Sequence, residues 1–331
     1  MIVFCHAIIL AENVDIVYLY VDNVYMRLVQ KLWKQSSDLT ATALLMLAAL
    51  VASLATMALD PRTIGGVSAW LKPAKFAIST AIFCATMAWI FGYLQPSRRL
   101  KLVGRILSAA LTLEVLIIFV QAARGTTSHF NFSTPLSGAL FGIMGVGILT
   151  LWVATIAVFI AAMRHKFQDG PWGWALRLGL LITVIGSAAG GLMLRTTPAQ
   201  AGYHQTPIRG AHTVGAPDGG PGLPVVDWST EHGDLRIPHF LGLHALQAIP
   251  LFAWLVRKRR RQTTLIGIAA ASYFSFVAVL AWQALRGESV AHPGSETLAA
   301  LAVWFAVSAG AFAWSQLPYP APRLHHSELS L

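Results

Sequence analysis

The chain has 331 residues, of which 56% are hydrophobic and only 11% are Asp, Glu, Lys or Arg, and its mean hydropathy is +0.61. Soluble domains carry about 25% charged residues, so this composition excludes an ordinary cytosolic enzyme, a disordered protein and a disulfide-rich secreted domain. The net charge of +10 fits basic loops that orient a membrane protein, and nucleic acid is not expected as a partner. The sequence therefore predicts an all-α integral membrane protein in contact with membrane lipids.

Residues 1–40 are expected to form an N-terminal cytoplasmic or interfacial segment. The first 25 residues contain three acidic residues but no Lys or Arg, which is atypical of a signal peptide. Met26 begins a basic stretch, MRLVQKLWKQ, so native translation is expected to start there. The alternative is that the first 25 residues form an amphipathic segment on the membrane surface.

Eight apolar segments are each close to the roughly 20 residues that cross a bilayer as a helix. They lie at about 41–59, 76–94, 104–123, 136–163, 175–194, 240–256, 263–285 and 297–317. One long loop, 195–238, connects the fifth and sixth segments. With the N-terminus in the cytoplasm, 16 of the Lys and Arg residues lie inside and 8 outside, which predicts an N-in, C-in orientation. We therefore expect a multi-pass membrane protein with the long loop outside and a cytoplasmic tail at 318–331.

An internal duplication is indicated by two segments that end alike. The third ends with QAARG at 121–125 and the seventh with QALRG at 283–287, each at a similar spacing from a preceding basic cluster. The pattern predicts one four-helix unit at 41–163 and a second at 175–317. Because four spans are an even number, the two units share an orientation and are parallel repeats.

Two small-residue patterns predict close helix contacts. Gly138 and Gly142 are four residues apart in the fourth segment, and Gly186 and Gly190 are four apart in the fifth. The other interpretation is ordinary packing without a special close approach.

Glu114 is the only acidic residue deep within an apolar segment. A carboxylate there costs a few kcal/mol on insertion scales, so it should face the helix bundle and have a partner. Gln121 lies about two turns further on the same face and Arg124 about one turn beyond it. This row predicts a catalytic path for a proton or a ligand; the alternative is a buried carboxyl group that holds the helices together. Phe276 is at the equivalent position of the duplicate segment.

Histidines on the outer side are candidates for binding a cofactor. His244 and Gln247 are three residues apart in the sixth segment and share a helix face, with His239 at its outer entrance. His129 and His292 lie at the outer ends of other segments. These residues predict a site for haem, a transition metal or quinone; the alternative is that each histidine bonds to a neighbouring helix.

The long outer loop is rich in Gly and Pro and is expected to fold as an ordered cap over the outer mouth, the alternative being a flexible tether. Its His212, His232 and Asp234 are candidate metal ligands. Lys72 and Lys75 begin the second segment from the same side. We expect them to extend toward the interface, and an anion-binding role is the alternative.

The segments WLKPAKF, QAARGTTSHFN, HTVGAPDGGPGLP and PHFLGLHALQ resemble those of a family of bacterial inner-membrane proteins without an assigned activity, over roughly residues 65–260. The duplicated eight-span plan with outer histidines is also similar to that of the haem A synthase family. This second resemblance is one of architecture only and carries over no functional residue.

The sequence favours a redox or cofactor-handling protein with a His and Glu site near the outer face. One alternative is a proton-coupled transporter of a small solute that uses Glu114. Another is a non-catalytic assembly protein that acts through a membrane-protein partner or a second copy. Whether the chain is an enzyme is left open by its residues.

Overall fold

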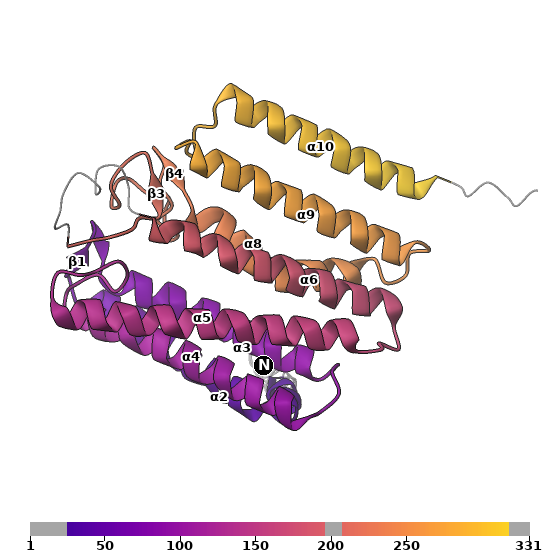
Figure 1. Ribbon diagram of the computed structural model, residues 1–331, viewed down its shortest axis with the longest axis horizontal. Coiled ribbons are helices and arrows are strands. Elements are labelled where there is room, and N and C mark those ends of the chain that lie inside the picture. The colour runs from indigo at the N-terminus through magenta and orange to yellow at the C-terminus, as the bar shows by residue number, and fades with distance from the viewer. Residues whose placement is uncertain (1–24, 196–206, 318–331) are drawn as a thin grey trace, which may run out of the picture.

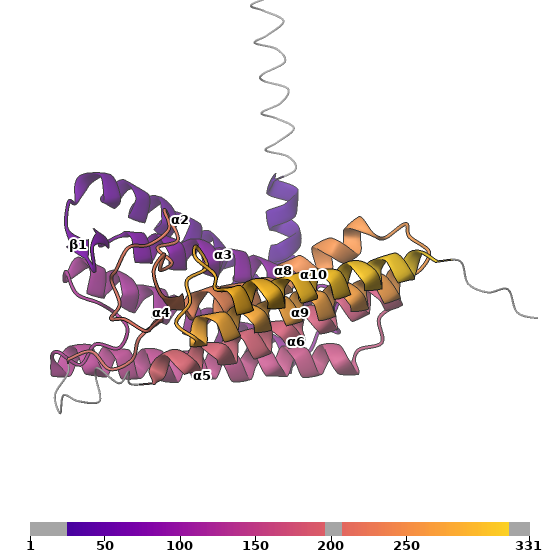
Figure 2. The ribbon, with the colours of Figure 1, turned by 90° about the horizontal axis from the view of Figure 1, so that it is seen from above.

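The computed structural model describes residues 25–195 and 207–317. The expected surface segment before Tyr25, the tail at 318–331 and part of the long loop lie outside the described residues. Residues 25–35 are helical and stand steeply against the helices that follow (Figure 2). The break falls at Ser36, whose backbone is extended.

Eight helices of 20 or more residues are present in the described parts of the chain, and each overlaps one of the eight predicted segments. Side chains of Ser97, Thr134 and Asp169 accept backbone N–H groups where three of them begin, which satisfies donors that a helix start leaves free. The helices are α2 (Ser37–Leu59), α3 (Leu71–Phe91), α4 (Arg98–Ala123), α5 (Pro135–Arg164), α6 (Gly170–Ala189), α8 (Arg236–Leu255), α9 (Gln262–Leu285) and α10 (Ser295–Gln316).

Seven of these helices are long and apolar enough to cross a membrane, counting the 3-10 turn η1 (Gly190–Leu194) that extends α6. Helix α8, which contains His239, His244 and Gln247, is not among them. The class of protein is therefore a multi-pass helical membrane protein.

The helices lie side by side along the long axis of the molecule (Figure 1). Helix α2 packs against α3 and α4, and α6 packs in the same way against α8 and α9. Helix α4 also contacts α5, α9 contacts α10, and α5 contacts α6. The last contact joins the group α2–α5 to the group formed by α6 and α8–α10.

Two short antiparallel hairpins lie at one end of the helices (Figure 1). Strands β1 (Thr63–Ile64) and β2 (Val67–Ser68) form the first, between α2 and α3. Strands β3 (Thr213–Val214) and β4 (Gly233–Asp234) form the second, between α6 and α8, with Thr213 opposite Asp234. The segments between α4 and α5 and between α9 and α10 turn at this same end, which we call the capped end.

Helices α6 and α8 approach closely at two glycines. A Cβ atom added to Gly186 would lie 2.4 Å from Cα of Gly242, and one added to Gly190 would lie 2.9 Å from the ring of His239. The prediction of close contact at Gly186 and Gly190 is confirmed. For Gly142 the corresponding prediction is wrong, because no heavy atom lies within 4 Å of its added Cβ; this part of α5 faces outward.

Candidate functional site

The candidate site is centred on Glu114 of α4, whose side chain is 3% exposed. Its Oε1 atom lies 3.5 Å from Nε2 of His129. Neither carboxylate oxygen has a hydrogen-bond partner within the described residues. A buried polar group without a hydrogen bond normally costs free energy. The predicted partner of Glu114 is therefore close by, but the carboxylate makes no hydrogen bond with it.

His129 lies in the turn between α4 and α5, at the capped end. Oγ of Ser128 is 3.0 Å from its Nδ1, and the rings of Phe76, Phe130 and Phe141 surround it at centroid distances of 5.6–6.3 Å. Burial lowers the pKa of His129 well below its usual value, and nearby positive charges lower it further. The imidazole is therefore neutral at pH 7, and it can donate one hydrogen bond and accept one.

Lysines at the start of α3 bring positive charge to the same place. Lys72 lies within electrostatic range of Glu114, and its ammonium is 5.9 Å from the ring centre of Phe76. Lys75 donates a hydrogen bond of 3.0 Å to the carbonyl of Val226 in the long loop. The two lysines thus differ, since Lys75 fastens the loop to α3 whereas Lys72 lies over the aromatic cluster around His129.

Gln121 and Arg124 support the turn that carries His129. Gln121 is fully buried and accepts a 2.5 Å hydrogen bond from Arg124, while its Nε2 donates to the carbonyl of Thr127 at 3.4 Å. The predicted row is therefore joined only at the end nearer the cap. Within the described residues Gln121 makes no hydrogen bond to Glu114, and its role here is to position the turn.

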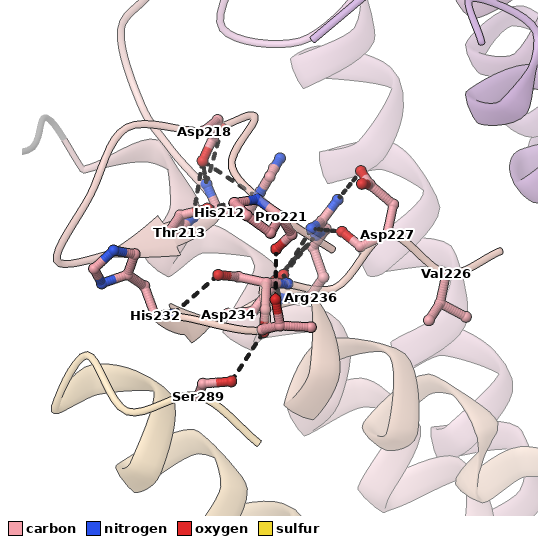
Figure 3. Close-up of polar contacts among 12 residues, drawn as sticks. His212, Thr213, Asp218, Pro221, Val226, Asp227, His232, Asp234, Arg236 and Ser289 are labelled. Carbon is pink, nitrogen blue, oxygen red and sulfur yellow. Dashed lines mark hydrogen bonds and ion pairs between the residues drawn. The ribbon is translucent and has the colours of Figure 1, made fainter. Parts of the chain in front are cut away.

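The long loop folds over the capped end as an ordered cap, built around the pair Asp234 and Arg236 (Figure 3). Arg236 binds both oxygens of Asp234 at 2.7–3.1 Å and also the side chain and carbonyl of Asp227. Burial alone would raise the pKa of Asp234, but the hydrogen bonds and charge of Arg236 bring it below its usual value. Asp234 also accepts the amide of Ser229.

His212 belongs to the same cap. Its Nδ1 lies 3.2 Å from Asp218, whose carboxylate also accepts the amide of Thr213 at 2.9 Å. Burial, together with the charge of Arg236, lowers the pKa of His212 to about 4. The expectation of an ordered cap is met for residues 207–235, since turns, side chains and the β3–β4 hairpin bond it together.

The structure does not bring the three candidate metal ligands of the loop into one cluster. Asp234 is occupied by Arg236, His212 faces Asp218, and His232 lies beside Gly215. Within the described residues there is no group of three His, Cys, Asp or Glu side chains placed to hold a metal ion.

The candidate cofactor histidines also have separate surroundings. Nδ1 of His239 is 2.9 Å from the carbonyl of Gly186, and Nδ1 of the exposed His292 is 3.1 Å from the carbonyl of Thr230. Each follows the alternative in which a histidine bonds to a neighbouring segment. Of the four candidate cofactor histidines, His129 is the one that lies beside an acidic side chain, that of Glu114.

His244 begins a hydrogen-bonded chain between the two groups of helices. Its Nδ1 is 3.1 Å from Oε1 of Gln247, and Nε2 of Gln247 donates to Oγ1 of Thr86 on α3 at 3.0 Å. Thr86 donates in turn to the carbonyl of Ile82. This order places the proton of His244 on Nδ1 and leaves Nε2 as an acceptor. Sequence reasoning missed Thr86, because nothing in the α3 pattern indicates which helix will face α8.

No family model, curated protein or solved structure matches the chain.

Proposed function

We propose that the chain crosses the inner membrane of a bacterium eight times, with both termini in the cytoplasm and the cap outside. The support is that α8 lies among the seven apolar helices, although it is less apolar than they are. Successive helices then begin on alternate sides. The basic run at 257–261 falls at the end opposite the cap, as the distribution of positive charge requires.

We also propose that α2–α5 and the group of α6 with α8–α10 are two parallel four-helix repeats. Equivalent pairs of helices pack together in each group. Asp60 binds Arg62 with the same set of bonds, at 2.7–3.1 Å, as Asp234 makes to Arg236. Repeats of this kind are frequent in transport proteins.

The function that we propose is proton-coupled transport of a small solute through the site at Glu114. The observation that carries the proposal is the buried carboxylate with two unbonded oxygens beside a neutral histidine. A carboxylate held only for packing would be bonded on at least one oxygen, whereas one that exchanges a proton or a ligand needs free positions. Ionisable residues inside a membrane mark such paths.

The surroundings favour a solute that carries an anionic group. Lys72 lies over the ring of Phe76 and makes no hydrogen bond within the described residues. Its ammonium group is therefore able to bind a carboxylate or phosphate. Glu114 and His129 would take and return the coupled proton. Phe276, at the equivalent position in the second repeat, stacks on Trp304 at 4.8 Å, so only the first repeat has this chemistry.

Proteoliposomes loaded with a pH-sensitive dye test this function. Alanine, succinate and inorganic phosphate are added one at a time, and proton movement is followed. We expect at least one of them to drive proton movement, and Glu114→Gln to slow it by about 100-fold, as loss of a general acid–base group does. Glu231→Gln, an exposed carboxylate change in the cap, is the control. An absence of proton movement with all three solutes, or an equal rate in Glu114→Gln, contradicts the proposal.

A second candidate function, binding of a haem, metal or quinone cofactor, is favoured by His244. Its Nε2 atom makes no hydrogen bond within the described residues. Its half-buried ring packs against Phe240 at a centroid distance of 4.2 Å. Both nitrogens of His129 have neighbours, so His244 is the better candidate ligand. Visible spectra of the oxidised and reduced protein, with solvent extraction of quinone, test this. His244→Phe should then lose the cofactor, and purified protein without any bound chromophore or quinone contradicts it.

A further inference from the structure

A groove between α2 and α4 lies at the end of the molecule opposite the cap. Its volume is about 500 Å³, within the range of small-molecule sites. The lining residues are small or apolar along its length, and charged residues lie at the end farther from the cap. They are Asp38, Ala41, Thr42, Arg105, Ser108, Ala109, Thr112, Leu113 and Leu116.

The groove contains a buried hydroxyl group without a partner. Ser108 is 8% exposed, and its Oγ has no hydrogen bond within the described residues. Hydroxyl groups in membrane helices commonly bond to the carbonyl four residues earlier, as Thr40 and Thr155 do here. The Oγ atom of Ser108 is enclosed by the protein, so the contacts with an occupant come from the exposed residues around it.

The charges at the end of the groove have a specific pattern. Arg105 of α4 and Asp38 of α2 lie side by side, with Nε and Oδ2 3.6 Å apart, and both side chains are exposed. A cation and an anion at this spacing match a zwitterionic head group, in which a phosphate faces Arg105 and an ammonium faces Asp38.

The length of the groove matches one leaflet of a membrane. From Arg105 to Leu116 is 11 residues of α4, or about 16 Å of helix, and the hydrocarbon core of a bilayer is about 30 Å thick. The apolar part of the groove, toward Leu113 and Leu116, would therefore hold the acyl chain of a lipid whose head group lies at Arg105.

We propose that this groove binds one phospholipid with an ethanolamine head group from the leaflet opposite the cap. Arg105 binds its phosphate and Asp38 binds its ammonium, because both side chains are exposed at the end of the groove. The site is separate from Glu114, so the proposal stands independently of the transport function.

Native mass spectrometry of the full chain tests the proposal. The protein is taken from nanodiscs of equal parts phosphatidylethanolamine and phosphatidylglycerol, and retained lipid is identified. We expect one retained phosphatidylethanolamine. Ala109→Trp, which fills the groove from an exposed position, should lower its retention at least about tenfold, or roughly 1.4 kcal/mol. Ala306→Trp on the exposed face of α10 is the matched control and should retain it.

Head-group variants separate the charge contacts from the groove itself. Asp38→Asn should remove the preference for phosphatidylethanolamine over phosphatidylglycerol while a lipid is still retained. Arg105→Ala should lower the retention of both lipids. Equal retention of the two lipids by the unchanged protein, or full retention of phosphatidylethanolamine by Ala109→Trp, overturns the proposal.

Discussion

Gln121 and Gln283 make the same hydrogen bond at the ends of two different helices. In each case the buried amide donates to the carbonyl six residues later, of Thr127 and of Ser289. The glycine four residues after each glutamine has a positive φ, +69° at Gly125 and +77° at Gly287. The two turns therefore have the same hydrogen bond and backbone conformation. Of the two, the first is followed by a histidine, His129, that faces a buried carboxylate.

Replacing Glu114 by Gln should leave stability unchanged or raise it. The substitution breaks no hydrogen bond, because neither carboxylate oxygen has one within the described residues, and it removes a buried group that is costly whenever it is ionised. Thermal unfolding in detergent measures this effect. Glu288→Gln is the comparison, because Glu288 accepts bonds from Thr297, Gly294 and Arg286 and its replacement should lower the unfolding midpoint. A large fall in the unfolding midpoint of Glu114→Gln would show that Glu114 holds the helices together.

The cap should loosen as the pH falls from about 6.5 toward 4. The pKa of His212 is about 4 in the folded cap and about 6.5 in an unfolded chain. In this range the unfolded chain therefore binds a proton that the folded one excludes. The free energy of unfolding then decreases as pH falls, by up to about 3 kcal/mol.

Hydrogen exchange of residues 207–235 at pH 7, 5.5 and 4.5 measures this change. His212→Gln should flatten the pH dependence, whereas His292→Gln, a change at an exposed ring, should preserve it. A cap that exchanges equally at all three pH values in the unchanged protein would show that His212 does not exclude a proton.

Arg236→Ala should open the cap. Asp234, whose side chain is 0% exposed, would be left as a buried charge without its cation, which typically costs about 3–5 kcal/mol. Limited proteolysis between α6 and α8 reports the change. Arg62→Ala breaks the equivalent pair where the arginine is 49% exposed, so it should have a smaller effect; the reverse order would contradict this account.

Gly186→Ala should destabilise the packing of α6 on α8. Its Cβ would lie 2.4 Å from Cα of Gly242, so the helices would have to separate, and overpacking of this kind costs about 1–3 kcal/mol. The unfolding midpoint of the purified protein measures the loss. Gly142→Ala meets open space and should be neutral or mildly stabilising, so equal effects of the two changes would argue against a tight α6–α8 contact.

Much of the fold could be predicted because each helix is a local property of the chain. An apolar segment of about 20 residues in a bilayer must bond its own backbone, so the eight segments could be located without knowing their neighbours. The special position of Glu114 was also visible, since a single carboxylate in an apolar run is conspicuous. The metal cluster at His212, His232 and Asp234 could not be judged in this way, because loop residues close in sequence can face different partners.

What the sequence by itself determined is the membrane class, the positions of the helices and the buried carboxylate at Glu114. The tertiary structure decided which residues meet. His129, rather than His244, lies beside Glu114. Asp234 forms an ion pair with Arg236 instead of joining a metal cluster, and Gln247 bonds to Thr86 across the two groups of helices. Hydropathy and helix propensity are local, whereas a partner for a buried polar group is chosen by packing between segments far apart in the chain.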